Sequence, residues 1–118
     1  MMSQKHYVYI FVRQDISNEQ QLVQSSHVAL VLGTRLGRKY QYTSSKFNPD
    51  ELYFTVIGIP TLKDFVQVQQ DLGDVQYECF YEPDIGNQMT ALASYPIPVN
   101  HPIRKSKLKK YKLLKFKK

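Results

Sequence analysis

The sequence has few of the features that mark secreted, membrane or metal proteins. Its single cysteine, Cys79, can form no disulfide within the chain. No apolar run approaches the roughly 18 residues that a membrane-spanning helix requires, and the short apolar segment 6–12 is not followed by a signal-peptide cleavage pattern. One cysteine and three widely separated histidines do not make a zinc site. We therefore expect a cytoplasmic protein of a reducing compartment, with no metal or other cofactor.

Acidic residues are missing from the end of the chain. All ten lie at or before Asp84, whereas nine of the sixteen basic residues follow Pro102. The body thus has seven basic and ten acidic residues, and the tail carries nine positive charges. Such a tail favours a polyphosphate partner, because each neutralised phosphate releases condensed counterions. An anionic membrane fits less well, and a merely solubilising end is the alternative.

Apolar periodicity predicts alternating strands and helices within one domain of residues 1–99. The 118 residues are 42% apolar, enough for a single packed core. The first helix is predicted to start at a capping box of Ser17 and Gln20 and to end before Gly33. The predicted strands are 6–13, 52–59, 75–81 and 89–96, and the predicted helices are 17–32 and 61–72.

The element order β-α-β-α-β-β predicts an α/β fold. Strands joined through helices are expected to be parallel, whereas the short link before the last strand allows a hairpin. We expect a three-layer α/β/α arrangement with a mixed four-stranded sheet. Residues 33–50 are predicted to form a long basic flap, and residues 100–118 a basic C-terminal tail that docks partly through its apolar residues.

The first helix carries an unusual polar stripe. At 100° per residue, Gln20, Gln24 and His27 fall on one side of the helix. The neighbouring side contains the residues predicted to pack on the sheet, namely Leu22, Val23, Ser26, Ala29 and Leu30. Neutral amides and an imidazole tolerate partial burial in a cleft, which makes the stripe a candidate site. Ordinary helix formers and a histidine bonded to the backbone would give the same pattern.

A second polar group follows the third predicted strand. The loop 82–90 contains Glu82, Asp84, Asn87 and Thr90, and in α/β proteins ligands tend to bind beyond the carboxyl ends of the strands. A simple turn would use several of the same residue types. Cys79, in the middle of the strand, is expected to be a buried thiol rather than a nucleophile.

Three segments in order along the chain carry a resemblance. "VRQDIS", "QLVQSSHVAL" and "EPDIGNQMTALASYP" are similar to motifs of the type II (archaeal and eukaryotic-type) peptidyl-tRNA hydrolase family, of which this would be a small, diverged member. The resemblance covers roughly residues 6–96. The matching residues are Arg13, Asp15, Gln24, His27, Ala29, Asp84, Thr90, Leu92, Ala93 and Pro96. Gln20 stands where the family has its catalytic lysine, and Ser25 where it has a cysteine.

The resemblance implies hydrolysis of the ester between a peptide and the terminal ribose of tRNA. Asp84 or His27 would be the base, with Gln20, Gln24 and Thr90 as neutral donors that position water. Cations would hold the RNA through its phosphates. The candidates are Arg13, Arg35, Arg38, Lys39, Lys46, Arg104, Lys105, Lys107, Lys109 and Lys110. The alternative is a non-catalytic tRNA- or RNA-binding module that has lost the lysine at position 20. Pairing of sheet edges could give a homodimer.

Overall fold

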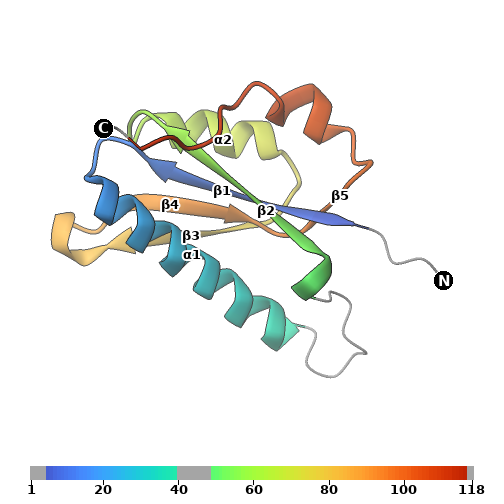
Figure 1. Ribbon diagram of the computed structural model, residues 1–118, viewed down its shortest axis with the longest axis horizontal. Coiled ribbons are helices and arrows are strands. Elements are labelled where there is room, and N and C mark those ends of the chain that lie inside the picture. The colour runs from blue at the N-terminus through green and yellow to red at the C-terminus, as the bar shows by residue number, and fades with distance from the viewer. Residues whose placement is uncertain (1–4, 40–48, 117–118) are drawn as a thin grey trace.

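A mixed sheet forms the centre of the molecule, as the computed structural model in Figure 1 shows. The structure describes residues 5–39 and 49–116. The strands are β1 (His6–Arg13), β2 (Leu52–Ile59), β3 (Tyr77–Glu82), β4 (Gln88–Ser94) and β5 (Ile97–Pro98). The helices are α1 (Asn18–Lys39) and α2 (Asp64–Leu72), with the short helical turns η1 (Pro49–Glu51), η2 (Pro83–Ile85) and η3 (Arg104–Leu108).

The sheet has the order β2-β1-β4-β3. β1 pairs in parallel with β2 and antiparallel with β4, and β3 is antiparallel to β4. β1, β2 and β3 therefore run in one direction and end at the same edge of the sheet, where β4 begins. This confirms the predicted α/β fold and its mixed four-stranded sheet. The sequence did not indicate β5, a two-residue strand that pairs with the start of β1.

Both faces of the sheet are covered, which explains the nearly continuous apolar run of β1. Val8, Ile10 and Val12 pack beneath α1 with Val28 and Leu32. The alternate residues of β1 pack on the other side in a core shared with α2 and the tail, which contains Tyr9, Phe11, Phe65, Val68, Leu72 and Leu108. Figure 1 shows α1 on one side of the sheet and α2 with η3 on the other. The three-layer prediction is confirmed.

The first helix is longer than predicted and passes through two glycines. α1 continues to Lys39, so Gly33 and Gly37 lie inside it. A helical glycine costs about 1 kcal/mol relative to alanine. Leu36 packs against the α1-side core and so holds the last turns on the sheet. Arg35, Arg38 and Lys39 are therefore helical residues rather than parts of a flap, and Lys46 lies outside the described residues.

The prediction of which side of α1 faces the sheet is wrong. Leu22 and Leu30 are 54% and 69% exposed, and Val23 is exposed as well. The buried side instead contains Gln21, Gln24, Val28 and Leu32. Hydrogen bonds support this inward side: Gln24 is bonded at both ends of its amide, and Gln21 Nε2 donates to the Ile16 carbonyl, although the buried Gln21 Oε1 has no partner among the described residues. Hydrophobicity alone therefore predicted the wrong rotation of the helix.

The basic tail packs on the body at three places. Leu108 is buried against the α2-side core. Tyr111 Oη donates to Asp71 Oδ2 on α2 at 2.5 Å, and Lys110 Nζ lies 2.8 Å from the same oxygen. Near its end, Leu113 forms an antiparallel bridge with Ile57 of β2, and the Leu114 amide donates to the Val56 carbonyl. The described part of the tail is thus integrated with the fold.

Candidate functional site

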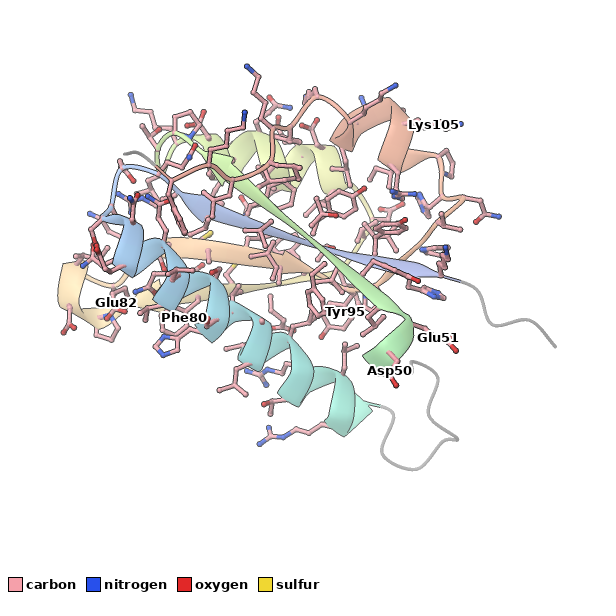
Figure 2. The ribbon with its side chains drawn as sticks, viewed as in Figure 1. Asp50, Glu51, Phe80, Glu82, Tyr95 and Lys105 are labelled. Atoms are coloured by element: carbon pink, nitrogen blue, oxygen red, sulfur yellow. The ribbon has the colours of Figure 1, made fainter. Side chains whose placement is uncertain are left out.

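A polar cluster forms where β1 and β3 end and β4 begins, under the first turns of α1. Gln24 and His27 come from α1, Phe80 and Glu82 from β3, and Thr90 from β4. Figure 2 shows Glu82 and Phe80 beside this part of α1. The parallel strands bring their ends to one edge, and the capping box fixes the start of the helix there: Gln20 N donates to Ser17 Oγ, and Ser17 N donates to Gln20 Oε1.

Gln24 connects the cluster. Its side chain is 3% exposed, yet both ends of the amide are paired. Nε2 donates to Glu82 Oε2 at 2.8 Å, and Oε1 accepts from Thr90 Oγ1 at 2.9 Å. Thr90 is fully buried, so the orientation of the amide is set from inside the protein. The result is an amide that holds one carboxylate in place.

Glu82 is the carboxylate of this cluster. The hydrogen bond from Gln24 lowers the pKa of Glu82, and the Asp84 amide and the nearby charge of His27 act in the same direction. Glu82 is therefore ionised at neutral pH. The His27 ring lies 4.5 Å from the Phe80 ring, centroid to centroid, and the residue is exposed. An anchored carboxylate thus lies near an exposed imidazole.

Arg13 supports the neighbouring turn and is 7% exposed. Its Nε and Nη2 atoms donate to both oxygens of Asp15, at 2.8 and 2.9 Å. Nη1 donates to Gln88 Oε1 at 2.8 Å and to the Met89 carbonyl. The paired guanidinium lowers the pKa of Asp15. Arg13 consequently joins the end of β1 to the start of β4 and presents little surface to an RNA.

The structure brings together three of the five predicted catalytic residues. Gln24, His27 and Thr90 meet in the cluster, whereas Gln20 is exposed one turn earlier and Asp84 is exposed in η2. Only the Asp84 backbone amide reaches the cluster, where it donates to Glu82 Oε1 at 3.2 Å. Glu82 belongs to the polar loop 82–90 of the sequence but is not among the predicted catalytic residues. Its place as the last residue of the strand, before the Pro83 turn, was the available signal.

Five of the ten predicted RNA-binding cations, all of them in the tail, lie on the other side of the sheet from this cluster. Figure 2 shows Lys105 on the side of η3, away from Glu82 and Phe80. Lys105, Lys107 and Lys109 are exposed, while Arg104 and Lys110 contact the body. On α1, Arg38 is exposed and Arg35 lies 3.8 Å from Glu78. One RNA contact surface would therefore have to extend around the molecule.

Three remaining predictions concern a metal site, a membrane span and the Cys79 thiol. Within residues 5–39 and 49–116, no group of three or more His, Cys, Asp or Glu side chains is arranged to hold a metal ion. None of the helices described is long and apolar enough to cross a membrane. Burial, with the charge of Glu78, raises the pKa of the Cys79 thiol to about 11, so the thiol is protonated and unreactive at neutral pH.

The fold and the cluster define a mixed-sheet α/β protein with a buried amide, a carboxylate and an imidazole at the carboxyl edge of its sheet. No protein-family model matches the chain, and no curated protein matches it. Among solved structures, the chain is similar to a protein of unknown function from Agrobacterium tumefaciens str. C58. The TM-score is 0.58 at 14% sequence identity, over 98% of this chain and 100% of that one. At this identity the similarity shows the fold alone.

Proposed function

We propose that the protein is a peptidyl-tRNA hydrolase-like esterase. One observation carries the proposal: Gln24 joins Thr90 to Glu82 beside His27, so that the helix and the late-loop segments that carry the family resemblance meet in one cluster. The third resembling segment, at the end of β1, lies at the same edge through Arg13 and its bond to Gln88. Three segments distant in sequence thus support one site.

The chemistry requires a base, a positioned water and a donor for the oxyanion. His27 is the exposed group that accepts the proton of the attacking water, and Glu82 stabilises the imidazolium that results. The water oxygen bonds to the ester carbonyl carbon. The imidazolium then returns the proton to the departing ribose oxygen as the ester bond breaks. Gln24 and Thr90 are positioning residues, because they orient Glu82 from the interior.

Gln20, one turn before the cluster on α1, is the neutral donor that we assign to the developing oxyanion. Its Oε1 accepts the Ser17 amide in the capping box, and the residue is exposed. A neutral amide stabilises an oxyanion less than the lysine of the resembling enzymes would. This same residue favours the second candidate function, a tRNA- or RNA-binding module without turnover.

Release of labelled peptide from a peptidyl-tRNA analogue distinguishes the two functions. We expect the parent protein to release peptide. The rate should fall by about 10²-fold or more in His27→Ala and Glu82→Gln, and by less in Asp84→Asn. Asp74→Asn, an exposed carboxylate on a different turn, is the matched control. Gln20→Lys should raise the rate. A parent that releases no more peptide than buffer, yet binds tRNA, rejects the esterase and supports the binding module.

A further inference from the structure

A cavity of about 640 Å³ lies on the α2 side of the sheet, remote from the Gln24 cluster. It is formed between Tyr9 of β1 and the segment that runs from Val99 through η3 to Lys109. Its volume is within the roughly 300–1,000 Å³ of sites that hold small molecules. The proposed esterase cluster does not use it, although Arg104, Lys105 and Lys109 of its lining are also among the candidate RNA-binding cations.

Arg104 is held beside this cavity by two hydrogen bonds and one ring contact. Its guanidinium carbon lies 3.7 Å from the centroid of the Tyr7 ring, an arrangement that fixes the plane of the group. Nε donates to Tyr9 Oη at 2.9 Å, and Nη1 donates to the Val99 carbonyl at 2.8 Å. Among the described residues, Nη2 has no partner. A guanidinium whose position is fixed by other contacts, and which still has free N–H groups, can pair with an anion.

Of the other polar lining residues, Lys105, Lys109 and His101 supply donors, and Asn100 carries an amide with both a donor and an acceptor. Lys105 and Lys109 add two ammonium groups, and no acidic residue is among the described residues that line the cavity. His101 Nδ1 accepts the Ile103 amide, so the hydrogen of a neutral imidazole is on Nε2, which makes that nitrogen a donor as well. The cavity thus concentrates positive charge with no carboxylate of its own to neutralise it.

Apolar groups form the remaining wall. Val99, Pro102 and the Tyr9 ring line the cavity beside the cations. A free inorganic anion would leave these surfaces unoccupied, whereas an organic phosphate covers them with its ester group. We propose that this cavity binds a phosphate ester of nucleotide size, whose phosphate pairs with Arg104, Lys105 and Lys109 and whose organic part packs on Val99 and Pro102.

Isothermal titration calorimetry of the full chain with AMP tests the proposal, since AMP presents a phosphate and a flat organic group. We expect AMP to bind more tightly than inorganic phosphate, adenosine to bind at least about tenfold more weakly, and excess phosphate to compete. Absence of AMP binding, or equal binding of adenosine, overturns the proposal. Binding of a 5′-hydroxyl hexaribonucleotide without binding of AMP also overturns it, in favour of an RNA groove.

Charge variants identify the site. Arg104→Lys keeps the positive charge but loses the planar set of guanidinium N–H donors. It should weaken AMP binding at least about tenfold. Because Arg104 also anchors the tail, Lys105→Gln/Lys109→Gln provides a second test through exposed side chains. Lys112→Gln, an exposed tail residue outside the lining, is the matched control and should bind like the parent. Unchanged affinity in the double variant excludes this cavity. No outcome depends on hydrolysis of peptidyl-tRNA.

Discussion

At the scale of single residues, the site depends on one buried amide whose two ends face different partners. Gln24 would be costly to bury without them, because an unpaired buried polar group loses its hydration. Thr90 and Glu82 satisfy it from β4 and β3. The same two bonds that permit burial also fix the carboxylate, so stability and the proposed chemistry are coupled here.

Thr90→Val should therefore destabilise the protein by about 1–3 kcal/mol, because Gln24 Oε1 loses its donor inside the protein. Urea denaturation measures the change. Thr90→Ser keeps the hydroxyl and is the control, with a smaller loss that reflects the missing methyl group. Equal losses in the two variants would contradict the role of the hydroxyl.

Residue identity in the loop was predictable only in part. Glu82 and Asp84 are both acidic and two positions apart, and the resemblance pointed to Asp84. The end of β3 and the 3₁₀ turn that follows decide between them, since they leave Asp84 exposed and place Glu82 against Gln24. A sequence pattern does not fix the rotation of a turn with that precision.

At the scale of elements, α1 shows how hydrogen bonding can override a hydrophobic pattern. The apolar side that includes Leu22 and Leu30 faces solvent, and the side with two glutamines faces the sheet. The predicted helix was also too short, because Gly33 was predicted to end it. Leu36, beyond Gly33, packs on the core and keeps the chain helical. Both errors arise because packing decides what propensity and periodicity only favour.

Two leucines of α1 test its rotation. Leu32 is 2% exposed and Leu30 is 69% exposed. Leu32→Ala should cost about 2–5 kcal/mol, as expected for a cavity in a packed core, while Leu30→Ala should cost less than about 0.5 kcal/mol. Denaturation midpoints of the matched pair give the answer. A larger loss at Leu30 would mean that the helix presents its other side to the sheet.

The junction between α2 and the tail should be sensitive to acid. Burial raises the pKa of Asp71, but hydrogen bonds from Lys110, Tyr111 and Gln67 outweigh it, and the pKa lies below its ordinary value of 3.8. A depressed carboxyl pKa contributes stability above the unfolded-state value, and this contribution is lost as the pH falls through the folded-state value.

Asp71→Asn should therefore destabilise the protein at pH 7, and its deficit relative to the parent should shrink as the pH falls below about 3.8. Urea denaturation at several pH values measures this. Asp74→Asn, an exposed neighbour, is the control and should follow the parent at each pH. A deficit for Asp71→Asn that does not change with pH would contradict the ionised pair.

At the scale of the whole molecule, charge is distributed unevenly. The sequence places nine positive charges after Pro102. The described part of that segment begins with η3, then contacts α2 and ends along the outer edge of β2. Because Leu108 and Tyr111 anchor the segment in the core, deleting it would disturb the fold as well as the charge. Substitution of exposed lysines separates the two effects.

Replacing Lys105, Lys107, Lys109 and Lys112 with glutamine should leave the denaturation midpoint nearly unchanged, since all four side chains are exposed. If the tail contacts RNA, the slope of log affinity against log salt should become shallower by up to about 0.7 for each lost phosphate contact. Filter binding of tRNA at a series of salt concentrations measures the slope. A slope equal to that of the parent would remove these lysines from the RNA contact surface.

The sequence by itself determined the element order, the mixed α/β sheet, the capping box and the concentration of charge at the end of the chain. These are local properties, because strand patterns, a Ser-to-Gln spacing and a charge run can be recognised within a few residues. The tertiary structure alone decided which side of α1 is buried, which acidic residue meets Gln24, and that Arg104 is held against Tyr7 and Tyr9. These depend on partners 58 to 97 residues away in the chain, whose bonds and contacts exist only once the sheet has formed.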